Sequence, residues 1–390
     1  MKEGWEIKKL GEVVSFQRGL TYSKDDEVES SGSCVLRSNN IDLETMTIVL
    51  DELKYIREDF FVSEDKKVRP NTILICMSNG SKQHLGKVAH IDTDYGYAFG
   101  GFMGLLNPNL KIVNSKYVYY SCLSPSYKYF LMGIGNGANI TNLKFSDLSD
   151  FPIPVPPLPT QERIVSELDC INSIIEKKRE QLKELDTLAQ SIFYDMFGDP
   201  IRNGKGWEVR KLGEVAEISS GGTPSRKKQE YFTGNINWYS AGELNSLYLP
   251  DSVEQITEDA IKESAAKIFK CNTLMVGMYD TAAFKMGILK KDSASNQACA
   301  NVNLHTDNVV WMYYLLTFMK DEALKHRHGA RQKNLNVGFI KSFQIPLPPL
   351  PLQQEFATKI EAIEKQKELI KRSIAEVETL LASRMQYYFG

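Results

Sequence analysis

The chain has 390 residues, of which 42% are hydrophobic and 25% charged, and its formal net charge at pH 7 is −2. This length is enough for two or three domains, each with its own core. The small net charge argues against a protein that coats nucleic acid by bulk charge, and no apolar run approaches the ~20 residues needed to span a bilayer.

The N-terminal residues contain no apolar segment of the kind found in signal peptides. The six cysteines include no Cys-x-x-Cys pair, and the five histidines show no metal-ligand spacing. This usage is typical of reduced thiols, so the sequence predicts a cytoplasmic protein without a metal site.

The chain is an internal duplication. Residues 4–19 and 206–221 share Gly-Trp-Glu and Lys-Leu-Gly-Glu-Val, and the proline-rich FPIPVPPLP at 151–159 recurs as FQIPLPPLP at 343–351. Two copies of this length are too few for a solenoid. The sequence therefore predicts a globular domain followed by a long helix, twice.

Each globular copy is predicted to be mixed α/β. Short runs rich in apolar and β-branched residues predict strands at 33–37, 71–78, 87–91 and 102–106, and at 235–240, 272–279, 286–290 and 298–304. Segments rich in Tyr, Leu and Met predict helices at 115–132 and 307–325. We interpret their aromatic residues as core and not as a base-stacking platform.

Two segments, 160–197 and 352–389, have the heptad spacing of a coiled coil. The first seam consists of Ile164, Leu168, Ile171, Ile175, Lys178, Leu182, Leu185, Ala189, Ile192 and Met196. The second consists of Phe356, Ile360, Ile363, Lys367, Ile370, Ile374, Val377, Leu381, Arg384 and Tyr388. The mid-seam lysine in each helix is a device that can fix register.

The ends of the first helix carry signals of their own. Prolines are tolerated in a first turn, Thr160 is a candidate N-cap, and Phe-Gly-Asp-Pro at 197–200 predicts the stop. The helices can pack each on its own domain or pair with each other. We favour an antiparallel intramolecular coiled coil, because a whole globular copy separates the helices and lets the chain return.

Motifs for catalysis are missing from the sequence. It contains no P-loop, no Gly-x-Ser-x-Gly, no His-Glu-x-x-His and no protein-kinase signature. Pro-Pro-Leu at 156–158 lacks the aromatic residue of an amino-methyltransferase motif, and Asp251 and Glu263 lack a lysine suited to a nuclease site. We therefore expect no catalytic residue and no cofactor site in this chain.

The loops in which the two copies differ are rich in small polar residues, amides and cations. Arg and Lys suit guanine and phosphates, and Asn and Gln suit adenine, so these loops are candidate DNA contacts. The candidates are Arg18, Thr21, Tyr22, Arg37, Asn39, Asn40, Ser78, Asn79, Lys82 and Gln83, then Thr223, Ser225, Arg226, Lys227, Tyr239, Tyr279 and Lys285. The alternative is that these residues merely form turns.

Two equivalent turns, 137–143 and 329–335, precede the proline-rich segments. Their polar residues could bind backbone phosphates, and the alternative is a solvated turn. The candidates here are Thr141, Lys144, Arg331, Gln332 and Lys333.

Taken in order, these motifs resemble the DNA-specificity subunit of type I restriction–modification systems. The features are the two Gly-Trp-Glu…Lys-Leu-Gly-Glu-Val segments, Ser-Gly-Gly-Thr-Pro-Ser at 220–225, and the two proline-rich entries to long helices. The resemblance implies two target-recognition domains, each reading one half of a bipartite, asymmetric DNA site, and an antiparallel coiled coil that separates them. It also implies two modification subunits and further restriction subunits as partners, which use S-adenosylmethionine, ATP and Mg.

We accordingly expect recognition domains at 1–158 and 200–350, and helical spacers at 159–199 and 351–390. A helix of ~38 residues is a rod of ~57 Å. Half-sites one DNA turn apart have centres ~34–36 Å apart, so the rod is long enough to set their spacing. The alternatives are a coiled-coil scaffold without DNA specificity, and a fused methyltransferase or nuclease active by itself.

Overall fold

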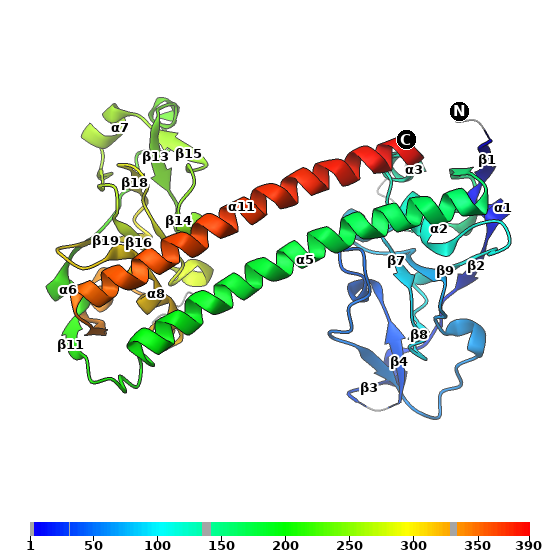
Figure 1. Cartoon of the computed structure of the whole chain (residues 1–390), viewed down its shortest axis with the longest axis horizontal. Helices are drawn as coiled ribbons and strands as arrows, with labels where there is room; N and C mark the ends of the chain where they lie inside the picture. The colour runs from blue at the N-terminus through cyan, green and yellow to red at the C-terminus, as the bar shows by residue number, and fades with distance from the viewer. Residues whose placement is uncertain (1–3, 31, 135–141, 328–333) are drawn as a thin grey trace. The chain divides into compact units, whose positions relative to one another are not determined.

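The computed structural model describes residues 4–30, 32–134, 142–327 and 334–390 (Figure 1). The chain forms two compact units. The first contains residues 1–179 and 372–390, and the second contains residues 180–371. Each unit therefore includes part of both long helices, α5 (Leu158–Phe197) and α11 (Leu350–Phe389).

The first unit contains ten strands and four short helices among its described residues. The strands are β1 (Glu6–Lys9), β2 (Val14–Arg18), β3 (Glu27–Val28), β4 (Ser33–Leu36), β5 (Lys54–Ile56), β6 (Thr72–Cys76), β7 (Val88–Ile91), β8 (Ala98–Phe99), β9 (Met103–Pro108) and β10 (Pro152–Val155). The helices are α1 (Leu10–Val13), α2 (Ser115–Ser121), α3 (Pro125–Ile134) and α4 (Phe145–Ser149).

Its strands form one sheet of order β2-β9-β6-β7, a second of order β3-β5-β4-β8, and the ribbon β1-β10. The central strand β6 is buried along its whole length. Ile73 and Ile75 face a cluster that includes Tyr117 of α2, whereas Leu74 faces a cluster with Phe99 of the second sheet. A strand covered on both faces reads as a continuous apolar run, as this one does.

The second unit also contains ten strands, and it has five short helices, again counted over the described residues. The strands are β11 (Glu208–Lys211), β12 (Ala216–Ser220), β13 (Ile236–Tyr239), β14 (Asn245–Tyr248), β15 (Glu254–Ile256), β16 (Leu274–Gly277), β17 (Met286–Ile288), β18 (Ala294–Ser295), β19 (Cys299–Leu304) and β20 (Gln344–Leu347). The helices are α6 (Leu212–Val215), α7 (Glu258–Lys262), α8 (Val309–Phe318), α9 (Lys320–Leu324) and α10 (Val337–Ser342).

Its main sheet has the order β12-β19-β16-β17-β14, beside a sheet β15-β13-β18 and the ribbon β11-β20. The strand β14 extends this sheet by pairing in parallel with β17. In the first unit the sheet ends at β7, so the two copies share a framework and differ at this edge. All eight strands predicted from the sequence are present, and the expected mixed α/β class is confirmed.

The proline-rich segments, interpreted from the sequence as entries to the long helices, each also contain a strand. Pro152–Val155 is a strand, which pairs antiparallel with β1, the strand that begins at the glutamate of the Gly-Trp-Glu motif. The second copy repeats this ribbon with β11 and β20. Each strand of a two-stranded ribbon has an outer edge, where proline needs no ladder partner. Within each unit, the N-terminal motif and the proline-rich motif, which both recur between the copies, are therefore paired with each other.

Three predicted boundaries were wrong. The helix α5 begins at Leu158, before the candidate N-cap Thr160, which lies within its first turn. The helix predicted at 115–132 is two helices, α2 and α3, separated by Cys122–Ser124, and the one at 307–325 is likewise α8 and α9. Pro125 opens α3 because proline fits a first helical position. The predicted stop of α5 is correct, since Gly198 adopts a positive φ of 76°.

The two long helices run antiparallel within each unit. In the first unit, Arg179 pairs with Glu378 at 3.1 Å and Glu167 pairs with Arg384 at 2.8 Å. In the second, Lys367 of the seam pairs with Asp186 at 2.8 Å. The predicted seam residues are buried or half-buried apart from Arg384, beside which Met385 is buried instead. The alternative in which each helix packs on its own copy is wrong, because α5 also enters the core of the second unit.

Candidate nucleic-acid interface

The loops of the first unit meet at one end of its main sheet. Arg18 at the end of β2 is in register with Gly104, and Cys76 at the end of β6 is in register with Met103 at the start of β9. The end of β4 joins them, because the Gly100 amide donates to the Leu36 carbonyl at 2.9 Å. We call this end, from which the loops after β2, β4 and β6 and before β9 emerge, the loop edge.

The second unit has the same loop edge. Ser220 at the end of β12 is in register with Ala300, and Gly277 at the end of β16 with Cys299. The segments that follow the predicted polar turns are docked on this edge by equivalent bonds. The Leu143 amide donates to the Met77 carbonyl at 2.7 Å, and the Leu335 amide donates to Met278 at 2.7 Å.

Most described candidates of the first copy lie at its loop edge. Arg18, at the end of β2, is exposed, and Arg37 directly follows β4. The Asn79 amide donates to the Ser38 hydroxyl at 2.9 Å, which joins the loops after β4 and β6. Thr21, Tyr22, Asn39, Ser78, Gln83 and Lys144 lie in or next to these loops with at least part of each side chain accessible.

Some candidates are committed to internal bonds. Asn40 is fully buried; its amide donates to the Val49 and Asp51 carbonyls at 3.1 Å each, and its oxygen accepts from the Arg37 amide at 2.9 Å. Tyr239 is buried, and its hydroxyl donates to the Pro250 carbonyl at 2.7 Å. Neither side chain is available to a ligand, and we leave both out of the interface.

Arg226 is also partnered within the second unit. Its guanidinium forms a bidentate pair with Glu254, with Nη2 2.8 Å from Oε2. It lies 4.4 Å from the centre of the Phe232 ring and 5.0 Å from that of Trp238. These contacts fix the position of the guanidinium, and Glu254 neutralises its charge. We therefore interpret Arg226 as a residue that orders its loop.

The other candidates of the second copy are more open. Thr223, Ser225, Lys227 and Tyr279 are exposed, and Lys285 is half-buried. Thr141, Arg331, Gln332 and Lys333 lie outside the described residues, as does the side chain of Lys82.

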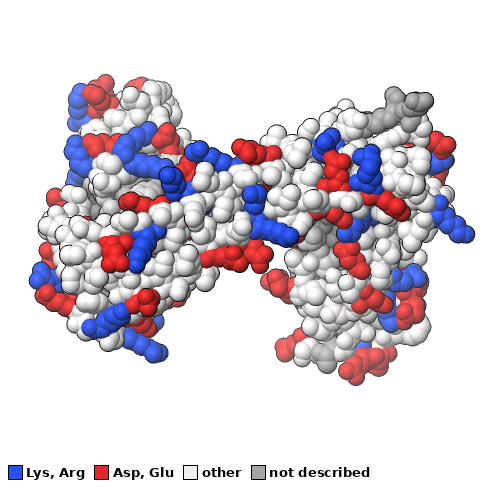
Figure 2. All heavy atoms as spheres, in the orientation of Figure 1, with Lys and Arg blue, Asp and Glu red and all other residues white. Residues whose placement is uncertain are grey.

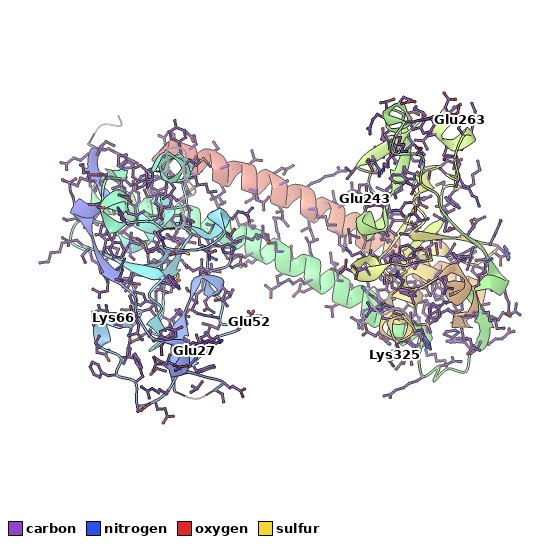
Figure 3. All side chains as sticks on the ribbon, turned by 180° about the vertical axis from the view of Figure 1, so that it is seen from behind. Glu27, Glu52, Lys66, Glu243, Glu263 and Lys325 are labelled. Carbon is purple, nitrogen blue, oxygen red and sulfur yellow. The ribbon has the colours of Figure 1, made fainter. Side chains whose placement is uncertain are left out.

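On the face drawn in Figure 2, neither sign of charge predominates. Figure 2 shows basic and acidic side chains intermixed on the face drawn. Many acidic groups are engaged internally, including Glu27, Glu243 and Glu263, which are labelled in Figure 3. Glu27 pairs with Lys54 and Glu263 with Lys228, each at 2.8 Å, and Glu243 accepts from the Ser240 amide. On the face drawn, the basic side chains do not form one continuous surface.

A buried glutamine joins each long helix to its unit. Gln161 of α5 is fully buried, and its amide nitrogen donates to the carbonyls of Pro156 at 2.7 Å and Ile112 at 3.1 Å. Its oxygen accepts from the amide of Asn114, the N-cap of α2, at 2.8 Å. One side chain thus fixes the proline-rich segment, the first turn of α5 and the start of α2.

Gln353 makes the same junction in the second unit. Fully buried, it donates to the Pro348 carbonyl at 2.9 Å and to Asp307 at 2.8 Å. Its oxygen accepts from the amide of Asn308, the N-cap of α8, at 2.9 Å. A glutamine follows the proline run in each copy, and no role was predicted for it from the sequence.

The residues that the structure describes contain no cluster of potential metal ligands. In the described part of the chain, no group of three or more His, Cys, Asp and Glu side chains could hold an ion. All six cysteines, each of them within that part, are free thiols. Among the same residues, no helix combines the length and apolar character needed to cross a bilayer.

The fold and its two loop edges define a duplicated, two-unit binding protein built on a pair of long helices. Residues 2–185 and 204–379 match the model of the type I restriction modification DNA specificity domain, and the chain belongs to this family. It is thus a DNA-specificity subunit, a non-catalytic component of a type I restriction enzyme. This confirms the resemblance seen in the sequence and sets aside the scaffold and the fused-enzyme alternatives.

Similar proteins agree with this assignment. The chain is 24% identical to the StySPI specificity subunit of Salmonella potsdam, over 99% of this chain and 88% of that protein. It is 28% identical to the EcoKI specificity subunit of Escherichia coli K12, over 53% of this chain and 44% of that protein.

Two solved structures share the fold. A chain from a structure of the assembly and conformational transition of a type I restriction–modification system has a TM-score of 0.62 at 18% identity, covering 100% of this chain and 98% of that one. The S subunit from M. genitalium has a TM-score of 0.58 at 14% identity, covering 99% and 96%.

Proposed function

We propose that each unit reads one half of a bipartite, asymmetric DNA site through its loop edge. Residues 1–158 and 200–350 would be the two target-recognition domains, and residues 159–199 and 351–390 the helical spacers. The observation that carries this proposal is that the two units share a backbone framework but differ in the loops that it holds. Both loop edges are held by equivalent backbone bonds, yet different side chains emerge from them. Two readers of different half-sites require this combination.

In this proposal the accessible polar residues of the loop edges contact different groups of the DNA. Arg18, Arg37 and Lys227 suit phosphates and guanines, whereas Asn39, Asn79 and Gln83 suit adenines. Smaller roles in positioning fall to Thr21, Tyr22, Ser78, Lys144, Thr223, Ser225, Tyr279 and Lys285. The candidates outside the described residues, Lys82, Thr141, Arg331, Gln332 and Lys333, remain in the proposal as phosphate contacts.

The paired helices would set the distance between the half-sites. Each helix has 40 residues, which corresponds to about 60 Å. That exceeds the ~34–36 Å between half-sites one DNA turn apart and leaves length for docking. We further propose that two modification subunits dock along the helices and that restriction subunits join them in the cytoplasm. S-adenosylmethionine, ATP and Mg would be bound by those partners.

Replacing residues 20–150 with the corresponding segment of a relative of different specificity tests the two-reader assignment. The chimera should be co-purified with its modification subunits, and the methylated motif determined by sequencing. We expect one half-site to change and the other half-site and the spacer to stay. The reciprocal replacement, of residues 222–342, should change the other half-site. A change of both half-sites, or of neither, would contradict the assignment.

A further inference from the structure

A tight turn lies at the centre of each loop edge, and neither turn was among the predicted contacts. In the first unit the Met103 amide donates to the Gly100 carbonyl at 2.8 Å, which closes a β-turn over Gly101 and Phe102. In the second, the Cys299 amide donates to the Asn296 carbonyl at 3.3 Å and closes the equivalent turn. Each turn leads directly into the strand that crosses the core of its sheet, β9 or β19.

Both turns are held by the same surroundings. The Phe102 carbonyl accepts from the Met77 amide at 2.9 Å, and the Ala298 carbonyl accepts from Met278 at 2.8 Å. The final glycine of the repeated N-terminal motif lies against each turn. A Cβ on Gly19 would stand 2.0 Å from the Gly100 carbonyl oxygen, and one on Gly221 would stand 2.2 Å from that of Ser295. The framework therefore fixes the position of each turn.

The side chains at the two tips differ. Phe102 is 72% exposed, whereas its counterpart Ala298 is 9% exposed. In the second unit the exposed residue of the turn is Gln297, one position earlier. The Thr223 hydroxyl donates to the Gln297 amide oxygen and so orients that amide. The two units thus share the same turn, but its exposed side chain is apolar in the first unit and an amide in the second.

The chemistry of these tips matches particular base edges. In the major groove the apolar group on a base-pair edge is the C5 methyl of thymine, and aromatic side chains contact it. A glutamine amide instead pairs with adenine, accepting from N6 and donating to N7. The oxygen of Gln297 keeps a second lone pair for this purpose after accepting from Thr223.

We propose that the turns 100–103 and 296–299 are base-reading elements, in which Phe102 contacts the methyl group of a thymine and Gln297 pairs with an adenine. This inference rests on the proposed function that each unit reads one half-site. A wedge inserted between base steps in the minor groove is the other use of an exposed phenylalanine. The neighbouring Arg37 and Asn79 are residue types that read the major groove, so they favour the methyl contact.

Base analogues test Phe102 directly. The complex with its modification subunits is titrated with duplexes in which each thymine of the first unit's half-site is replaced by deoxyuridine, one at a time. At one position the affinity should fall about fourfold, the weight of one buried methyl group. Phe102→Ala should bind both duplexes equally. Leu110→Ala is the matched control, because Leu110 is 54% exposed beyond the opposite end of β9 and should keep the discrimination.

The same design tests Gln297 in the other half-site. Replacing one adenine by 7-deazaadenine removes the N7 acceptor and should weaken wild-type binding roughly tenfold, within the range of a bidentate base contact. Gln297→Ala should lose this sensitivity. Thr306→Ala, at an exposed position beyond the opposite end of β19, should retain it.

The outcomes separate this inference from the proposed function. If Phe102→Ala still discriminates thymine from deoxyuridine, or if the half-site contains no thymine, the assignment of Phe102 is overturned. If Phe102→Ala weakens binding equally for every sequence, Phe102 is a wedge and the methyl contact is again overturned. In these cases the segment replacement still tests the two-reader proposal. A wild-type complex without any half-site preference would overturn both.

Discussion

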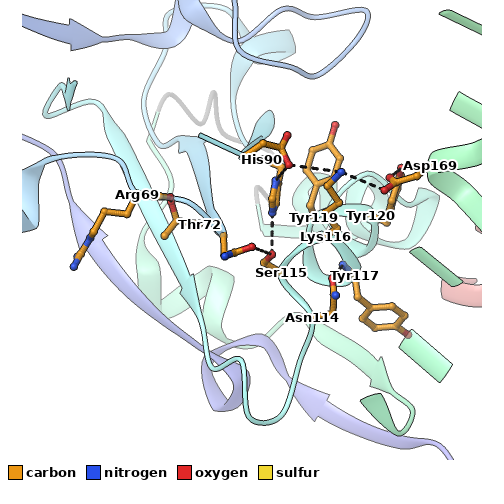
Figure 4. A network of polar contacts seen from close by, with 12 residues as sticks. Arg69, Thr72, His90, Asn114, Ser115, Lys116, Tyr117, Tyr119, Tyr120 and Asp169 are labelled. Atoms are coloured by element: carbon orange, nitrogen blue, oxygen red, sulfur yellow. Dashed lines mark hydrogen bonds and ion pairs between the residues drawn. The ribbon is translucent and has the colours of Figure 1, made fainter. Parts of the chain in front are cut away.

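The two junctions between a long helix and its unit use the same glutamine in different surroundings. Gln161 and Gln353 make equivalent bonds to a proline carbonyl and to the N-cap residue of a short helix, α2 or α8. Around Gln161 the contacts between α2 and α5 include polar ones beside their shared apolar cluster (Figure 4). Lys116 lies 3.2 Å from Asp169, and the Tyr120 hydroxyl donates to the same carboxylate at 2.5 Å.

Around Gln353 the contacts are aromatic. Phe356 lies edge-on to Phe193, Phe197 and Tyr314, with ring centres 5.4 to 5.5 Å apart. Both sets of contacts hold a helix of the globular part against a long helix. The difference teaches that the path of the chain through the junction is retained while the packing beside it can change. Under the proposed function the path matters, because it would set how a recognition domain leaves its helix.

The largest effect is therefore expected from the glutamines. Gln161→Leu keeps the side-chain volume and leaves two carbonyls and one amide, all buried or half-buried, without these partners. Each such group costs about 1–3 kcal/mol, so local stability at the junction should fall by several kcal/mol. Gln353→Leu should do the same in the second unit. Hydrogen exchange of the amides around α2 and α8 measures both losses.

Gln354→Leu is a control for this comparison, because Gln354 is the exposed neighbour of Gln353. It should leave exchange near α8 unchanged. If Gln161→Leu and Gln353→Leu also leave their junctions unchanged, the glutamines do not determine the path, and the shared bonds are incidental.

The long helices could be predicted because their signal is local and periodic. Ile164, Leu168 and Ile171 show the heptad spacing without any knowledge of their partners. The ribbons could not, because Ile7 pairs with Pro154 across most of the copy, and the prolines were interpreted only as the entry to a helix. The start of α5 was misplaced for the same reason, since Pro159 lies inside its first turn.

The loop edges were predictable as regions but not residue by residue. Asn40 and Arg37 look alike as loop residues, yet the partners of the Asn40 amide, Val49 and Asp51, bury it. Phe102 was assigned to a strand, where half of all side chains face inward. Its exposure depends on the turn that Gly100 closes with Met103, and Met77 and Gly19, which are distant in the chain, fix the position of that turn.

The next largest effect should come from the aromatic junction. Phe356 is fully buried, and Phe356→Ala should cost about 3–5 kcal/mol in the second unit. Phe356→Ile installs the residue type that the first unit has at the corresponding Ile164. It should recover part of this loss, measured by exchange in α8 and in the first turns of α11. If Ile is no better than Ala there, ring geometry and not apolar volume holds this junction.

The smallest effect is a pH dependence confined to the first unit. Burial lowers the pKa of His90, against the opposing influence of Asp92. Its ring accepts or donates at 2.9 Å to the Ser115 hydroxyl, at the start of α2. The corresponding residue of the second unit is the buried Ile288, which does not titrate. The stability of the first unit's junction should therefore depend on pH through His90, whereas the second unit has no titratable group at this position.

The sign of the effect follows from linkage. Above the unfolded pKa of about 6.5, His90 is neutral in both states and has no effect. As the pH falls through that value, the unfolded chain binds a proton that the folded chain resists, so stability of the first unit should fall. His84, whose pKa is also lowered by burial, adds to this loss.

Protection factors of β7, corrected for intrinsic exchange, should therefore drop between about pH 7.5 and about pH 5.5. His90→Gln should reduce the drop and leave the part due to His84, while β17 stays unaffected; an unreduced drop would show that the buried ring does not couple the junction to pH.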